Sequence, residues 1–99
     1  MGHQALLTAL LGKGIKLSGS TLAEQQTQDD AAAGVLTFTA NFSTIEIYNT
    51  DATNPGTFEV NGITINVPAT KVFKGAIGGT PGATVTIAGA TTYIVSRYT

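Results

Sequence analysis

The segment Thr57–Ala69, TFEVNGITINVPA, decides the fold that the sequence predicts. Apolar and polar residues alternate on both sides of an Asn-Gly pair at positions 61 and 62. Such a pair predicts a hairpin closed by a type I′ turn, because both residues tolerate positive φ. Side chains in a strand alternate between two faces, so the hairpin has one apolar face, formed by Phe58, Val60, Ile63, Ile65 and Val67. A single hairpin is marginal in water, and this face needs further strands to cover it.

Short runs of the same kind continue from Gly34 to the end of the chain. They predict strands at residues 35–39, 42–48, 71–77, 83–88 and 91–98, with the last two joined as a hairpin around Gly89. Closely spaced strands of this length are typical of a sandwich or small barrel. The inward positions predict a core of Phe38, Ile45, Ile47, Phe58, Val60, Ile63, Ile65, Val67, Val85, Ile87 and Ile94. The predicted fold is therefore all-β: a small antiparallel β-sandwich or barrel, preceded by an N-terminal arm with a short helix.

The first residues differ in character from the β region. Residues 4–11, QALLTALL, place Leu6, Leu7, Leu10 and Leu11 on one stripe of a short helix. A helix of this length is marginal alone, so the stripe needs a surface, either on its own domain or on a neighbouring subunit. Lys13 and Lys16 carry too little charge to favour a membrane surface.

Residues 18–33 are polar and small, which is typical of an arm or linker. The alternative is a short helix at residues 21–28, where Thr21 and Glu24 have the spacing of a capping box. We divide the chain into an N-terminal arm, residues 1–33, and a β domain, residues 34–99.

The composition narrows the classes of function. Charged residues make up 11% of the 99 residues and the net charge is −1, whereas about 25% is usual. A surface this neutral repels its copies weakly and suits a protein of an assembly, although an ordinary threonine-rich β surface has the same composition. The five Lys and Arg residues are scattered, which argues against nucleic acid, and no apolar run approaches the length of a membrane span. The last strand has apolar or aromatic residues on both faces, which makes Tyr93 and Tyr98 candidates for an interface.

Few residues could carry chemistry. The chain has no cysteine and one histidine, His3, which excludes thiolate sites and makes a zinc site or a catalytic triad a poor fit. Asp29-Asp30 is interpreted as a solvated charge pair in the polar arm. The glycine-rich residues 75–82 lack the Lys-Ser/Thr of a phosphate-binding loop and predict a turn. We predict no catalytic residue, cofactor or metal, and a protein that is not an enzyme.

One family resemblance covers residues 45–99. The motifs IEIYNTD, FEVNGITINVPA, FKGAIGG and ATVTIAGATTYIVSRYT resemble the small all-β virion proteins of tailed bacteriophages. In these an I-x-N-T strand precedes a V-N-G-I-x-I hairpin, and the chain closes on Y-I-V-x-R-Y. The resemblance implies a structural role as a capsid decoration (cement) protein, a head-fibre base, or a neck or tail part.

The predicted function is that of a non-enzymatic decoration protein on the capsid surface of a virion, clamping the head lattice. Its expected partners are the major capsid protein or other virion subunits and copies of itself, as a dimer or trimer, with no nucleic acid or membrane. The expected contact residues are Leu6, Leu7, Leu10, Leu11, Tyr93 and Tyr98. The alternatives are a neck or tail component, and a carbohydrate- or receptor-binding module that uses exposed tyrosines.

Overall fold

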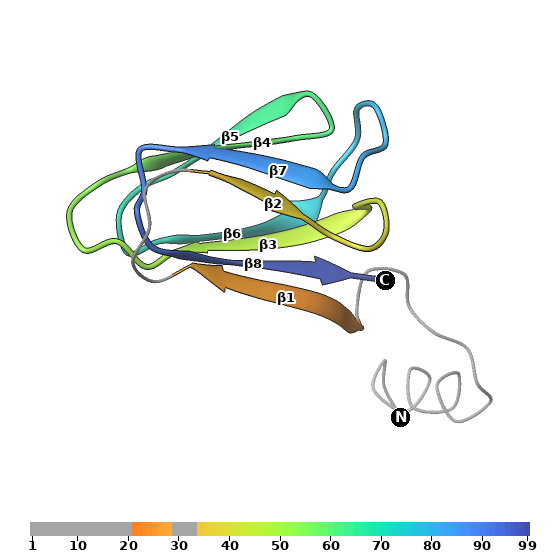
Figure 1. Cartoon of the computed structure of the whole chain (residues 1–99), viewed down its shortest axis with the longest axis horizontal. Coiled ribbons are helices and arrows are strands. Elements are labelled where there is room, and N and C mark those ends of the chain that lie inside the picture. Colours follow the sequence, from red (N-terminus) through yellow and green to blue (C-terminus); the bar gives the residue numbers. More distant parts are fainter. Residues whose placement is uncertain (1–20, 29–33) are drawn as a thin grey trace, which may run out of the picture.

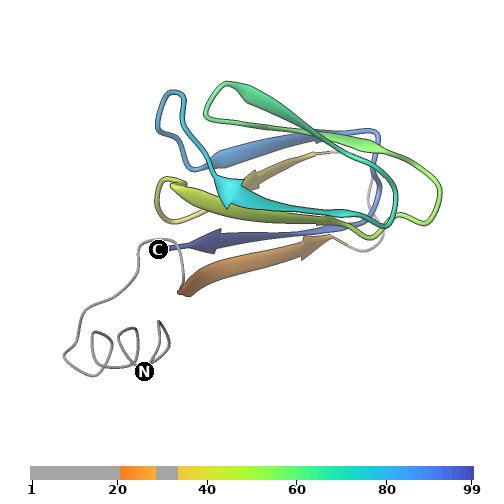
Figure 2. The same ribbon diagram turned by 180° about the vertical axis from the view of Figure 1, so that it is seen from behind.

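A computed structural model of the chain describes residues 21–28 and 34–99. These residues form the strands β1 (Leu22–Gln28), β2 (Val35–Thr37), β3 (Thr44–Asn49), β4 (Gly56–Val60), β5 (Ile63–Val67), β6 (Val72–Ala76), β7 (Thr84–Ala88) and β8 (Tyr93–Tyr98). They make two four-stranded sheets, ordered β1-β8-β3-β6 and β2-β7-β4-β5, in which all neighbours are antiparallel. Figures 1 and 2 show the sheets as two packed layers. The predicted all-β sandwich is confirmed.

The core lies between the two layers. Its buried apolar residues are Phe38, Phe42, Ile45, Ile47, Phe58, Val60, Ile65, Val67, Val85, Ile87, Ala90, Tyr93 and Val95. The predicted core is confirmed except at two positions. Ile63 is 37% exposed, because it directly follows the hairpin turn at the end of the sheet. Ile94 is half-buried, because the inward face of β8 is the one that carries Tyr93 and Val95.

The Asn-Gly turn has the predicted geometry. Asn61 and Gly62 have φ values of 55° and 76°, and Val60 pairs with Ile63 on either side of them, as a two-residue type I′ turn requires. The Asn61 side chain is buried, and its Nδ2 donates to the carbonyl oxygens of Phe42 and Gly78 at 3.3 and 3.0 Å. The turn therefore also fixes two loops at this end of the sandwich.

We predict that Gly62→Val lowers the free energy of unfolding by about 1–3 kcal/mol, because a β-branched residue is strained at positive φ. A Cβ at Gly62 would meet no atom within 4 Å, so the loss comes from the backbone alone. Gly78→Val is the matched control, since Gly78 also has open space but no positive φ. Urea unfolding measures both, and equal stability of the two variants would contradict the turn.

The alternative of a short helix at residues 21–28 is wrong. Residues Leu22–Gln28, which we placed in the arm, belong to the sandwich. This segment is strand β1, which pairs with β8 from Leu22↔Tyr98 to Gln28↔Tyr93. In Figure 1, β1 forms the edge of the lower sheet beside β8. The other residues of the predicted arm, 1–20 and 29–33, lie outside the described residues, with Asp29-Asp30 and His3 among them.

Polar side chains attach β1 to the sandwich. The buried Arg97 of β8 donates from Nε to Glu24 at 3.3 Å, and the Thr39 amide donates to the same carboxylate at 3.0 Å. These hydrogen bonds hold the pKa of Glu24 below its usual value, and the bond from the Thr39 amide contributes most. Gln26 donates to the Thr37 carbonyl of the opposite sheet at 2.7 Å. Strand β1 thus closes one side of the sandwich with hydrogen bonds in place of apolar contacts.

The predicted hairpin of the last two strands is wrong. Strands β7 and β8 belong to different sheets, and the chain crosses between the layers after Gly89, which has a φ of 91°. The Asp51 carboxylate accepts hydrogen bonds from the amide and hydroxyl of Thr91 at 3.1 and 2.9 Å. This contact holds residues 89–92 against the β3–β4 loop and directs the chain into the other sheet.

Candidate interaction surfaces

The outer side of the β2-β7-β4-β5 sheet is rich in threonine. Residues that are paired across this sheet share a face, and the pairs Thr37↔Thr84, Val35↔Thr86, Glu59↔Thr86, Glu59↔Thr64, Thr57↔Ala88 and Thr57↔Asn66 all point away from the core. We call this surface, formed by Val35, Thr37, Thr57, Glu59, Thr64, Asn66, Thr84, Thr86 and Ala88, the threonine face. Among the described residues of the face, Glu59 alone is ionisable. The surface is therefore a nearly neutral sheet face.

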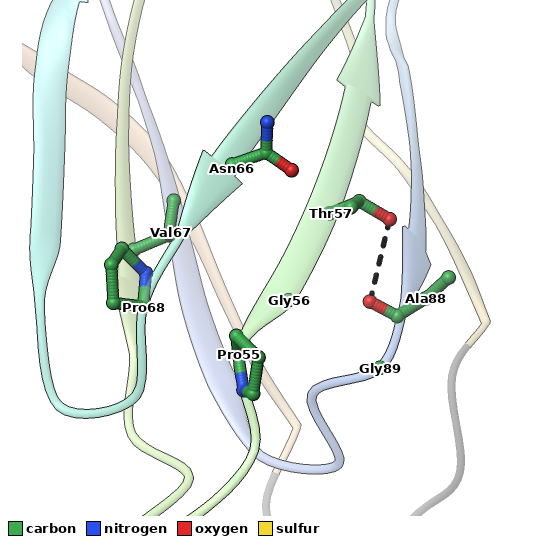
Figure 3. A pocket seen from close by; sticks show the side chains of 8 residues that line it. All are labelled: Pro55, Gly56, Thr57, Asn66, Val67, Pro68, Ala88 and Gly89. Carbon is green, nitrogen blue, oxygen red and sulfur yellow. Dashed lines mark hydrogen bonds between the residues drawn. The ribbon is translucent and has the colours of Figure 1, made fainter.

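A groove lies at one end of the threonine face. It has a volume of about 430 Å³ and is lined by Pro55, Gly56, Thr57, Asn66, Val67, Pro68, Ala88 and Gly89. Figure 3 shows the rings of Pro55 and Pro68 near the ends of β4 and β5, and the Thr57 hydroxyl donating to the Ala88 carbonyl at 3.5 Å. The side chains of the lining are neutral and mostly apolar.

Two glycines allow the strands to approach closely beside this groove. A Cβ at Gly56 would lie 2.8 Å from the Ala90 Cβ and from the Phe58 ring. A Cβ at Gly89 would lie 2.5 Å from the Pro55 carbonyl oxygen. Because any larger residue would displace backbone or core at these points, the shape of the groove depends on both glycines.

The outer side of the other sheet has an apolar row. Ile94 pairs with Tyr48, and Tyr48 pairs with Val72, so the three side chains form a line over β8, β3 and β6. Tyr48 is 41% exposed, Val72 is 55% exposed, and Ile94 is half-buried. We call these three residues the apolar row.

Polar residues border the apolar row on one side. Ser96, Glu46 and Lys74 occupy the neighbouring register positions. The Tyr98 hydroxyl donates to Glu46 at 3.1 Å, and the Lys74 ammonium lies 4.1 Å from the centre of the Tyr98 ring. The hydrogen bond to Glu46, followed by burial, raises the pKa of Tyr98. Tyr98 is thus already engaged within its own sheet.

The two tyrosines that we proposed for an interface lie in different environments. Tyr93 is 1% exposed, contacts Phe58 edge-to-face with ring centres 5.7 Å apart, and has a pKa that burial raises. It belongs to the core and presents no surface. Tyr98 is half-buried on the outer face. The other four proposed contact residues, Leu6, Leu7, Leu10 and Leu11, lie outside the described residues.

Asp51 joins the β3–β4 loop to the β7–β8 loop at the groove end of the sandwich. Its Oδ1 accepts from the amides of Thr53 and Asn54 at 2.9 and 3.0 Å, and its Oδ2 accepts from Thr91. These hydrogen bonds hold the pKa of Asp51 well below its usual range, and the bond from the Thr53 amide contributes most. Asn49 extends the network by donating to the carbonyls of Asn54 and Val67. The carboxylate is fully used by the fold, so we interpret Asp51 as a structural residue.

We predict that the stability of the protein depends on pH through Asp51. Because the folded-state pKa lies below the unfolded value of about 3.9, Asp51 stabilises the fold above that pH and loses this contribution as the pH falls below it. Asp51→Asn removes this dependence and lowers stability at pH 7, because asparagine has one acceptor oxygen, and its NH2 group cannot accept the bonds that the second carboxylate oxygen receives. Thermal unfolding between pH 2 and 7 measures the effect, with the exposed Glu59→Gln as control. Parallel pH profiles of the wild type and Asp51→Asn would contradict the assignment.

Sequence reasoning missed the threonine face, the groove and the apolar row as surfaces. The signal for part of the threonine face was present, since the hairpin pattern placed Glu59, Thr64 and Asn66 outward, and they are exposed. The groove and the apolar row depend on which strands become neighbours, which local patterns do not indicate.

Two other kinds of feature are absent from the described part of the chain. In residues 21–28 and 34–99, no three His, Cys, Asp or Glu side chains are grouped closely enough to hold a metal ion. The same residues include no helix with the length and apolar character needed to cross a membrane. Comparison of the sequence and structure with family models, curated proteins and solved structures finds no match.

Proposed function

We propose that the chain is a non-enzymatic structural protein of a phage virion, a capsid decoration protein that stabilises the head lattice through contacts between subunits. The observation that carries the proposal is the threonine face: a broad, nearly uncharged sheet surface with an apolar groove at one end. The resemblance of residues 45–99 to small phage virion proteins supports the same role.

The chemistry of the threonine face suits a protein contact. The cores of protein interfaces are depleted in charged residues, and burying an unpaired charge is costly. Threonine hydroxyls keep hydrogen-bonding capacity, while their methyl groups add apolar area. The groove between Pro55 and Pro68 has room for an apolar side chain of a lattice subunit. We propose that this face binds the major capsid protein and that copies of the chain associate as dimers or trimers on the capsid surface.

Sedimentation with purified particles tests this function. The chain is mixed with expanded capsid shells of the phage that encodes it, the shells are pelleted, and the bound chain is measured. We expect saturable binding by the wild type. Thr37→Lys, which β7 separates from Glu59, should weaken it at least about tenfold, because a buried unpaired charge costs more than about 1.4 kcal/mol.

Thr27→Lys is the matched control, since Thr27 is an exposed threonine on the outer side of the opposite sheet. It should bind as the wild type does. Equal loss in both variants, or no loss in either, would contradict the threonine face as the contact. Binding to neck or tail assemblies but not to shells would contradict the decoration role.

A further inference from the structure

The apolar row is the part of the β1-β8-β3-β6 sheet that the described residues leave without a partner. Side chains of cross-strand neighbours lie about 4.5–5.5 Å apart, so Ile94, Tyr48 and Val72 make one continuous strip. The adjoining polar residues are engaged, because Tyr98 contacts both Glu46 and Lys74. Tyr48 and Val72 nevertheless remain 41% and 55% exposed. A strip of this kind is suited to an apolar partner without charge.

The sequence offers such a partner within the same chain. Residues 4–11 include Leu6, Leu7, Leu10 and Leu11 and no charged residue. Packing this segment on the apolar row buries no charge on either side. Burial of these leucines removes apolar surface from water, which offsets the cost of ordering the segment.

The described chain begins close enough to the apolar row for the leucine segment to reach it. Thr21 exchanges two backbone hydrogen bonds with Thr99 at the end of β8, so the chain enters the sheet that carries the apolar row. From Thr21, Tyr48 is roughly 20 Å away, given strand spacings of about 4.8 Å and a rise of about 3.4 Å per residue. Residues 12–20 span at most about 30 Å when extended. The leucine segment can therefore reach its own apolar row.

We propose that the leucine segment, residues 4–11, docks on the apolar row Ile94–Tyr48–Val72 of its own chain. A tether of this length gives an effective concentration of about a millimolar. At micromolar protein, the segment of the same chain therefore occupies the row in preference to that of a second copy. This contact does not depend on the proposed function.

Disulfide trapping tests the contact, because the natural chain has no cysteine. The variant Leu10→Cys with Val72→Cys is compared with Leu10→Cys with Ala76→Cys. Ala76 is exposed on the same strand and face as Val72, outside the apolar row and nearer to Thr21. Under mild oxidation at micromolar concentration, we expect the first variant to form an intrachain disulfide at least about tenfold faster, because docking holds position 10 beside position 72, whereas the tether alone is the same in both variants. Equal rates would overturn the proposal. Disulfide-linked dimers that increase with protein concentration would also overturn it, by showing that a second copy occupies the row.

A second measurement needs no disulfide. Alkylation of Val72→Cys by iodoacetamide reports whether the row is covered, because a thiol must be accessible to react. We expect Leu7→Ser with Leu10→Ser, added to this variant, to accelerate alkylation several-fold and to leave Thr64→Cys unaffected. An unchanged rate at position 72 would contradict docking.

Discussion

Phe58→Ala is expected to lower the free energy of unfolding by about 3–5 kcal/mol, as measured by urea denaturation. Phe58 is fully buried in β4, and its ring packs edge-to-face on Tyr93 of the opposite sheet with an interplanar angle of 82°. Its loss leaves a cavity between the layers and removes this aromatic contact. Domains of this size are stable by about 5–15 kcal/mol in total, so the expected loss is a substantial fraction of the stability.

The control for this substitution is Thr86→Ala on the threonine face. Thr86 lies outside the core and is exposed, so its truncation should change stability by less than about 1 kcal/mol. Similar losses in Phe58→Ala and Thr86→Ala would mean that Phe58 does not join the two sheets.

Removal of residues 1–28 is expected to have a larger effect than Phe58→Ala. It deletes β1, exposes the edge of β8, and leaves the buried Arg97 without Glu24. Exposed strand edges also promote association. We expect this truncated chain to be largely unfolded or aggregated, whereas a chain that begins at Thr21 keeps β1 and unfolds cooperatively.

The two truncations can be compared by circular dichroism and size-exclusion chromatography. The comparison distinguishes the contribution of β1 to stability from that of the residues before it. The composition placed the start of the β domain at Gly34, after β1. If removal of residues 1–28 leaves a monomer as stable as the chain that begins at Thr21, β1 is dispensable and its pairing with β8 does not hold the sandwich together.

The strands that sequence patterns located are those with apolar residues on one face. Alternation identified β4 and β5, and Asn61-Gly62 fixed their register through its positive φ values. Strand β1 was missed because its inward residues Glu24 and Gln26 are polar. They close the sandwich through partners distant in the sequence, Arg97 and Thr37, so no local pattern indicates them.

The error at the end of the chain has a similar origin. Gly89 between two alternating runs favours a hairpin. In the structure, Asp51, which lies in a loop far away in the sequence, binds Thr91, and β8 joins the other sheet. Strand β8 has a neighbour on each side and apolar residues on both faces. Its pattern could not show whether Tyr93 or Ile94 faced the core. For this reason an interface candidate, Tyr93, proved to be a core residue.

The thermal stability of capsid shells tests the proposed function most directly. Expanded shells of the phage that the proposal takes as the source of the chain are heated with and without it, and opening of the shells is followed by light scattering or dye access. We predict that the wild-type chain raises the opening temperature until its sites are saturated, and that Thr37→Lys at the same concentration raises it much less. An opening temperature that saturating wild-type chain leaves unchanged would contradict a role in stabilising the capsid lattice.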